Sequence, residues 1–237
     1  MKIVTWNCNG ALRKKFEHLK DFNADIFVIQ ECENPSEINH NEYNEWAKNH
    51  LWIGDTKNKG IGIFAKKEIE LKKLNWSDNF KDHKVKHFLP CSVNNEFTLL
   101  AVWTHSNNSP TFGYIGQLWK YLQVNKDNLN KSLIVGDLNS NKIWDKWDSW
   151  WNHSDVVKEL SDIGIESLYH KYRNEEQGKE SQPTFFLHRK INNPYHIDYI
   201  FGSKEFSTKL NKIEIGDSNI WLEISDHLPM ICEFSTL

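Results

Sequence analysis

Several apolar segments of this 237-residue chain end in carboxylate, amide or imidazole side chains, which ligate cations and transfer protons in enzymes. The clearest example is the stretch 133–139, where Leu, Ile and Val precede Gly136, Asp137, Leu and Asn139. Three branched apolar residues in a row predict a short strand buried on both faces. Because α/β proteins bind ligands beyond the carboxyl ends of their strands, Asp137 and Asn139 are candidate catalytic residues. The alternative is a strand that runs into an ordinary Gly-Asp turn.

Other predicted strands lead to similar groups. Three of them precede an amide, a carboxylate and an imidazole: residues 2–6 before Asn7, 25–29 before Glu31, and 97–103 before His105. One acidic residue after a strand is usually a solvated loop charge, but the repetition favours a shared site. Nearer the C-terminus, residues 196–201 predict a strand with Asp198 in its middle, where a carboxylate needs a partner. Asp226 and His227 then form a polar elbow before the last strand.

The segments between these strands predict helices, further strands and one ambiguous region. Apolar spacing predicts helices over residues 12–22 and 115–122, and Ser154 is a candidate N-cap for a helix that Gly164 ends. Additional strands are expected at residues 60–65, 184–187, 213–215 and 220–224, with 184–187 beside 196–201. Trp144, Trp147 and Trp151 would share one face of a helix, which favours a core stripe; the alternative is a wall that stacks bases or sugars.

Composition limits the class of protein. With 39% hydrophobic and 26% charged residues, the chain reads as a soluble globular protein, and one domain over residues 1–237 is expected. No apolar run is long enough for a membrane span, and the N-terminus lacks signal-peptide features, so we expect a cytoplasmic monomer. The four scattered cysteines are expected to be reduced core residues. A net charge of −3 gives no global basic field for nucleic acid, but leaves room for a local basic groove.

Six motifs in this order resemble the endonuclease/exonuclease/phosphatase superfamily, which includes DNase I, exonuclease III-like abasic-site nucleases and lipid or inositol phosphoesterases. They are Trp6-Asn7-x-Asn9-Gly10, Gln30-Glu31, Thr104-His105, Gly136-Asp137-x-Asn139, His196-Ile-Asp198-Tyr-Ile and Ser225-Asp226-His227. The resemblance spans residues 2–234. It implies a DNase I-like four-layer α/β sandwich: two mixed β-sheets packed face to face, helices outside, and the site at one rim.

The resemblance also implies cation-assisted hydrolysis of a phosphoester. A phosphodiester is anionic, so positive charge must neutralise the developing pentavalent centre during attack by hydroxide. Cysteines and histidines lack zinc spacing, and the ligand atoms would be carboxylate and amide oxygens, so the expected ion is Mg²⁺ or Mn²⁺. The implied metal ligands are Glu31, Asn7, Asp226, Asp137 and Asn139. The sequence leaves open whether one metal or two are bound.

The remaining catalytic roles are assigned by the same resemblance. Asp198 would fix the tautomer of His227, and Asn139 would hold a phosphate oxygen. Either Asp137 or His227 could be the general base, and we favour Asp137 acting on water with His227 charged against the phosphate. His105 would stabilise the phosphate or protonate the leaving oxygen.

Two positions distinguish subfamilies. DNase I and the lipid phosphodiesterases carry His where this chain has His105, whereas abasic-site nucleases typically carry Tyr; Asn9 likewise replaces an Asp that is frequent in abasic-site nucleases. The expected substrate contacts are Asn9, Asn108, Arg13, Trp144 and Trp147. For Arg13, part of a basic cluster, a solvated helix start is an equal alternative.

Three functions follow from these expectations. The first is a metal-dependent nuclease acting on nucleic acid, most simply DNA. The second is a phosphoesterase acting on a small-molecule or lipid-headgroup phosphate, although no apolar membrane-contact hairpin is visible in the sequence. The third, from another class, is a catalytically silent nucleic-acid-binding or scaffold module. A long cationic groove would favour the first and a closed pocket the second.

Overall fold

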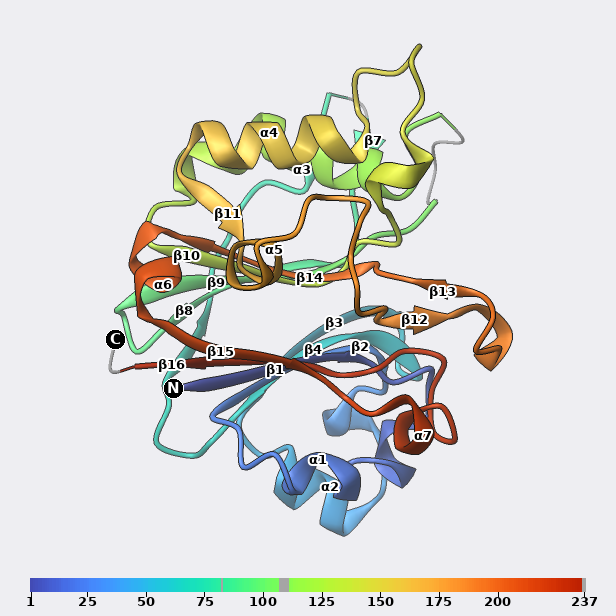
Figure 1. The fold of residues 1–237 in the computed structure, drawn as a ribbon. Helices are drawn as coiled ribbons and strands as arrows, with labels where there is room; N and C mark the ends of the chain where they lie inside the picture. The colour runs from blue at the N-terminus through green and yellow to red at the C-terminus, as the bar shows by residue number, and fades with distance from the viewer. Residues whose placement is uncertain (82, 107–110, 236–237) are drawn as a thin grey trace.

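The computed structural model describes residues 1–81, 83–106 and 111–235, and its strands form two mixed six-stranded sheets (Figure 1). The first sheet has the order β15-β16-β1-β2-β4-β3. Its strands are β1 (Lys2–Asn7), β2 (Ile26–Cys32), β3 (His50–Thr56), β4 (Lys59–Ala65), β15 (Leu210–Ile215) and β16 (Met230–Phe234). The second sheet has the order β11-β14-β10-β9-β8-β5. Its strands are β5 (Leu71–Lys73), β8 (Phe88–Val93), β9 (Phe97–Trp103), β10 (Ser132–Asp137), β11 (Ile165–Ser167) and β14 (Asp198–Ser203).

Both sheets have a parallel pair near the centre, and these pairs position the site. In the first sheet β1 pairs with β2 in parallel, and in the second β10 pairs with β9 in parallel. The other principal neighbours are antiparallel, β16 beside β1 and β14 beside β10. Since the carboxyl ends of parallel strands meet at one edge, the side chains that follow β1, β2, β9 and β10 come to the same rim of the sandwich.

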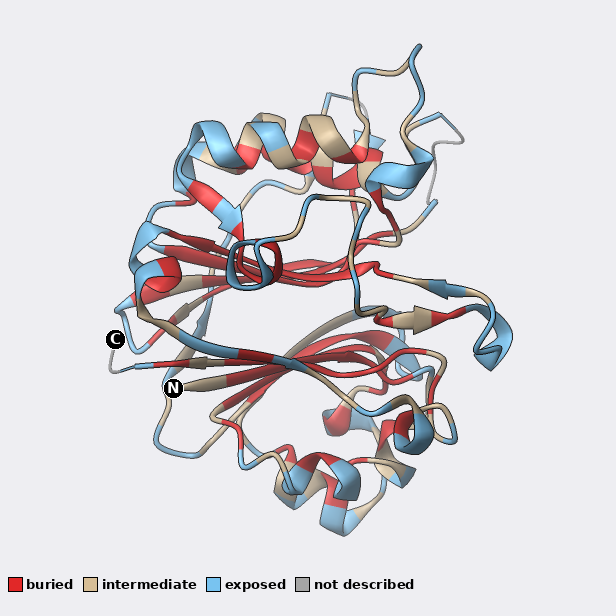
Figure 2. Ribbon diagram, in the orientation of Figure 1, coloured by how far each residue is buried: buried red, intermediate tan, exposed pale blue. Residues whose placement is uncertain are grey.

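The two sheets pack face to face around an apolar core, which Figure 2 shows as buried strands in both sheets. Inward-facing residues of both sheets form one cluster, including Ile3, Val28, Val135 and Ile200, each fully buried. Full burial of one such aliphatic side chain stabilises the fold by roughly 1.5–3 kcal/mol. The residues between them point outward, as strand alternation requires, and meet the helices.

Helices cover the outer faces of both sheets, so the predicted four-layer sandwich is confirmed (Figure 1). The first sheet is covered by α1 (Glu17–Lys20) and α2 (Asn41–Trp46), and the second by α3 (Ile115–Asn125) and α4 (His153–Asp162). At the edges lie α5 (Leu168–Arg173), α6 (Lys204–Lys209) and α7 (Ser218–Trp221). In the described part of the chain, every helix is too short or too polar to cross a membrane.

Short elements fill the connections. The 3₁₀ turns are η1 (Leu12–Lys14), η2 (Pro35–Glu37), η3 (Lys126–Asn128), η4 (Lys142–Trp144) and η5 (Leu187–Arg189). Two small hairpins are β6 (Asn79–Phe80) with β7 (His83–Lys84), and β12 (Phe185–Phe186) with β13 (Pro194–Tyr195). The second hairpin corrects the prediction that residues 184–187 lie beside 196–201, because β12 pairs with β13, just before β14.

Three further predictions of local structure were wrong. The stripe over residues 12–22 is buried, but η1 and α1 replace one continuous helix, because the chain breaks at Lys15 (φ −125°). Residues 218–221 form α7 rather than a strand, since the side chain of Asp217 caps a helix there. The N-cap of α4 is Asn152 instead of Ser154, in a reciprocal capping box with Asp155. Gly164, at φ +78°, follows the end of that helix as predicted.

Candidate active site

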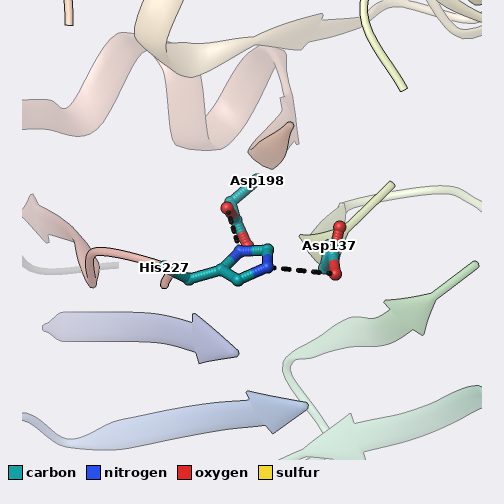
Figure 3. A group of neighbouring side chains, drawn as sticks. All are labelled: Asp137, Asp198 and His227. Atoms are coloured by element: carbon teal, nitrogen blue, oxygen red, sulfur yellow. Dashed lines mark hydrogen bonds and ion pairs between the residues drawn. The ribbon is translucent and has the colours of Figure 1, made fainter. Parts of the chain in front are cut away.

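A buried imidazole lies between two buried carboxylates at the rim of the sandwich (Figure 3). His227 Nδ1 lies 2.9 Å from Asp198 Oδ2, and His227 Nε2 lies 4.0 Å from Asp137 Oδ2. Asp137 and Asp198 are fully buried. Burial alone would lower the pKa of His227, but the charge and hydrogen bond of Asp198, with Asp137, raise it to about 9. Burial raises the pKa of Asp137 despite the opposing effect of His227.

Strand pairing places the two carboxylates directly opposite each other. Asp137, the last residue of β10, pairs in register with Asp198, the first residue of β14. Gly136 precedes Asp137 at φ +146°, and a Cβ there would lie 1.9 Å from the carbonyl oxygen of Val102. Glycine is therefore required before this aspartate, because only glycine allows β9 and β10 to approach so closely.

Asn7 connects the first sheet to this cluster. Its Nδ2 donates to Asp137 Oδ2 at 3.0 Å and to Glu31 Oε1 at 3.4 Å. Glu31 lies at a bulge in β2, where the register with β4 shifts between Gln30 and Cys32, and its φ is +60°. The bulge redirects a side chain that regular alternation would place elsewhere, as bulges near functional sites do. Lys59 Nζ forms an ion pair with Glu31 Oε2 at 2.9 Å.

Asn139, which follows β10 of the second sheet, also bonds to Asp137. Its Nδ2 donates to Asp137 Oδ2 at 3.0 Å and its backbone N–H to Asp137 Oδ1 at 2.8 Å. Asp226 is joined more remotely, because its Oδ1 accepts from Asn9 Nδ2 at 3.0 Å while the backbone N–H of Asn9 donates to Asn7 Oδ1. We call six of these residues the polar cluster: Asn7, Glu31, Asp137, Asn139, Asp198 and His227.

His105 lies on the side of the site near Glu31. Its ring centroid is 3.9 Å from that of Trp103 and 5.0 Å from that of His87. Burial lowers the pKa of His105, opposed by the charge of Glu31. Its Nε2 is buried and has no hydrogen-bond partner among the described residues, so it is available to a bound group.

Three residues at the site were not singled out by the sequence. His87 contacts His105 and lies 3.6 Å from Asp55, and burial lowers its pKa to about 4. Thr184 Oγ1 accepts the backbone N–H of Asp198, and Ser225 Oγ accepts that of His227. Only Ser225 carried a signal, as the first residue of the Ser-Asp-His motif.

The expected substrate contacts have different surroundings. Arg13 forms an ion pair with Glu33, which is 1% exposed, so this guanidinium has a structural partner and its substrate role gains no support. Asn9 faces Asp226, as described above. Asn108 falls outside the described residues. Trp144 ends the short 3₁₀ turn η4, Trp147 lies in the turn that follows, and both are exposed, which overturns the core-stripe interpretation.

The donor atoms fit a hard divalent cation. Glu31 Oε1 and Asp137 Oδ2 are held around one point, since the single Nδ2 of Asn7 reaches both. An ion bound at this point would take the place of the Asn7 N–H groups that now face these two oxygens. Its ligands would then be oxygen atoms only, which is the preference of Mg²⁺ and Mn²⁺. Asp137, Asp198 and His227 also place ligand atoms within 4.8 Å of one another. However, His227 and Asp198 already bind each other, so we favour the oxygen set around Asn7.

A DNase I-like sandwich with carboxylates, amides and a histidine at one rim defines a class of phosphoester hydrolases. The sequence matches the Endonuclease/Exonuclease/phosphatase family over residues 4–227, and the chain belongs to that family. It is accordingly a hydrolase acting on ester bonds. A search of curated proteins found no match.

Solved structures share the fold. An AP endonuclease from Archaeoglobus fulgidus has a TM-score of 0.75 at 17% identity, with 100% of both chains covered. The 3' phosphatase NExo from Neisseria, bound to product DNA hairpin, has a TM-score of 0.72 at 17% identity, again covering 100% of both chains. The catalytic domain of Xenopus laevis APE2 has a TM-score of 0.65 at 16% identity, covering 99% of this chain and 91% of that one.

Proposed function

We propose that this protein is a divalent-metal-dependent nuclease that hydrolyses DNA phosphodiesters. The observation that carries the proposal is the polar cluster itself. Residues from β1, β2, β10, β14 and the segment before β16 are connected by hydrogen bonds and two ion pairs at a single rim. Such convergence of distant, buried charges is unfavourable for stability unless the charges are paired, and it is typical of functional sites.

Glu31, Asn7 and Asp137 would hold the cation, with Asn139 and Asp226 beside them. Bound there, Mg²⁺ or Mn²⁺ would supply positive charge against the phosphate oxygens. His227, protonated near neutral pH because Asp198 raises its pKa, would face the same phosphate as a charged hydrogen-bond donor. Asp198 positions the ring by accepting from Nδ1.

Asp137 is the proposed general base. Its raised pKa matches what proton transfer near neutral pH requires, since an ordinary aspartate is too weak a base. Its carboxylate would accept a proton from the attacking water, while Asn139, which donates to both of its oxygens, holds it in place. His105, whose Nε2 has no hydrogen-bond partner among the described residues, would donate to the phosphate or the leaving oxygen.

DNA is proposed as substrate because two observations support a polymer of phosphates. Two lysines lie near the cluster on the side of the first sheet: Lys59 pairs with Glu31, and Lys15 donates to the carbonyl oxygen of Asn9. One structural neighbour was solved bound to a DNA hairpin. The buried free cysteines further suit our proposal of a cytoplasmic monomer, because reduced thiols are typical of that compartment.

An activity panel tests the proposal. Purified protein is offered supercoiled plasmid, single-stranded DNA, abasic duplex, RNA and a generic aryl phosphodiester, with Mg²⁺ or Mn²⁺ and with a chelator. We expect metal-dependent cleavage of DNA that the chelator abolishes. Hydrolysis of the aryl ester alone would overturn the nuclease proposal and favour the small-molecule phosphoesterase. No hydrolysis of any substrate would favour a silent binding module.

A further inference from the structure

Three tryptophans are exposed in the segment of the chain that follows Asn139 of the polar cluster. They lie in residues 142–152, which we call the tryptophan loop, between β10 and α4. Trp147 is 98% exposed, Trp150 64% and Trp144 46%. Figure 1 shows the segment that leads into α4, drawn in yellow, rising away from the sandwich. Several exposed indoles in one segment are unusual for a protein surface without a binding role.

The loop is held in place by its own hydrogen bonds. Asp145 accepts the backbone N–H groups of His153 and Ser154 at the start of α4, at 2.9 and 3.3 Å. Asn152 bonds both backbone groups of Lys146, at 2.9 Å each, and the carbonyl of Ser149 at 2.8 Å. The exposed rings therefore belong to a structured surface and are not a consequence of a loose segment.

The loop is continuous with the polar cluster. It borders a cavity of 630 Å³ whose lining includes Tyr114, Trp144 and Trp151, and also Asn139. Asn139 is the residue that donates to Asp137, so the cavity opens next to the proposed catalytic carboxylate. On another side, the ring of Trp144 lies 5.0 Å from that of Tyr195, in the hairpin whose Phe185 contacts His227.

The lining chemistry suits a planar base better than a phosphate. The charged side chains in the cavity wall are the carboxylates of Asp145 and Asp148 and the ammonium of Lys146, so phosphate would meet net negative charge. Aromatic rings offer flat faces, and the amides of Asn141 and Asn152 lie among them. The cations noted above lie on the first-sheet side of the cluster, where a phosphate backbone would be favoured.

We propose that the tryptophan loop and its cavity bind unpaired nucleobases by stacking, so that the substrate is presented as a single strand next to the polar cluster. This rests on the proposed nuclease function and specifies its substrate. Stacking on an indole requires a free base face, which a duplex interior does not offer. A membrane is the less favoured partner, because Asp145, Lys146 and Asp148 separate the tryptophans and no continuous apolar tip exists in the loop.

Fluorescence anisotropy in chelator tests the site without any hydrolysis. A labelled single-stranded oligonucleotide and a blunt duplex of equal length are titrated with wild type, with the double variant Trp144→Ala/Trp147→Ala, and with Trp147→Phe. Tyr172→Ala, which removes a 43% exposed ring on α5, is the matched control. We expect the double variant to lose at least about tenfold in single-strand affinity, and Trp147→Phe and Tyr172→Ala to lose much less. Duplex affinity should change less than about twofold.

Several results would overturn the proposal. They are unchanged single-strand affinity in the double variant, an equal loss on single strand and duplex, or a loss seen only in binding to vesicles of phosphatidylcholine and phosphatidylserine. Metal-dependent hydrolysis of an aryl phosphodiester should be unaffected by the control Tyr172→Ala, because that ring lies on α5 and belongs to neither the polar cluster nor the tryptophan loop. If wild type cleaves no DNA, the nuclease proposal fails, while the anisotropy still decides whether the loop binds bases.

Discussion

Asp137 and Trp147 lie close together in the sequence, yet one is fully buried and the other is 98% exposed. Asp137 is fixed by partners from both sheets, and its chemistry depends on exclusion of water, which raises its pKa. Trp147 projects from a loop whose backbone is held by the side chains of Asp145 and Asn152. Under our two proposals, the polar cluster carries out the reaction and the tryptophan loop binds the substrate. Changes in the first should affect activity and stability, and changes in the second binding alone.

The largest effect is expected from Asp137→Asn. The amide keeps the shape of the side chain but cannot accept the proton of water, so kcat should fall about 10²–10⁴-fold on any substrate that the enzyme hydrolyses. Steady-state kinetics measure it, and circular dichroism checks the fold. Asp127→Asn, an exposed carboxylate in η3, is the control. Retention of full activity in Asp137→Asn would remove Asp137 from the mechanism.

Gly136→Ala should destabilise the protein at the strand pair β9–β10, next to the buried Asp137. The new Cβ would meet the carbonyl of Val102, and the backbone at φ +146° disfavours any side chain, so we expect a loss of about 3 kcal/mol. Gly164→Ala is the matched control: its φ is +78° but nothing lies within 4 Å of the new Cβ, so only about 1 kcal/mol should be lost. Urea denaturation measures both. Equal losses would show that the close approach of β9 and β10 is unimportant.

The charge of His227 should make stability depend on pH. The pKa of His227 is about 9 in the folded protein, above the ordinary value near 6.5. The protonated histidine therefore contributes its full stabilisation of the folded state below pH 6.5, and this stabilisation is lost as pH rises through 9. The unfolding free energy should fall by up to about 3 kcal/mol over this range. Asp198→Asn should flatten that fall.

The difference between wild type and Asp198→Asn reports on His227 together with Asp137, because Asp198 raises the pKa of both groups. Buried thiols such as Cys8, whose pKa burial raises, also lower stability at high pH, but they act equally in both proteins. Denaturant titrations between pH 6 and pH 9.5 give the two curves. Parallel curves would mean that Asp198 does not sustain the charge on His227.

The smallest effect is expected from Trp147→Ala. Removal of a side chain that is 98% exposed loses few packing contacts, so the unfolding free energy should change by less than about 0.5 kcal/mol. Trp6→Ala is the contrast, because Trp6 is fully buried and its loss should cost about 3–5 kcal/mol. A large destabilisation by Trp147→Ala would show that the loop is part of the core.

The sequence predicted the strands and the convergence of their ends, for reasons that the structure makes clear. Apolar runs such as residues 133–135 are buried on both faces, so they carry a strong signal, and the polar groups that follow them meet because β1 with β2 and β9 with β10 are parallel. The family resemblance added the assignment of distant residues to one site. No local pattern could have paired Asn7 with Asp137, since their contact joins two sheets.

Local prediction was wrong where polar side chains compete with the apolar pattern. Tryptophan spacing suggested a helix over residues 144–151, but Asp145 and Asn152 bond the backbone of the loop and start α4 only at His153. His87 gave no signal, because it reaches His105 only through the pairing of β8 with β9, where Phe88 lies opposite Val102. Such contacts depend on register, which single-sequence patterns do not specify.

The hydrogen bond from Asn7 to Asp137 bridges the seam between the two halves of the sandwich. A shift of one sheet relative to the other would therefore change the distance between Glu31 and Asp137, even when neither residue is mutated. Trimming an interior aliphatic side chain such as Val135, far from solvent, could then slow turnover by misaligning the two halves. The packing of the core between the two sheets therefore sets the relative position of Glu31 and Asp137.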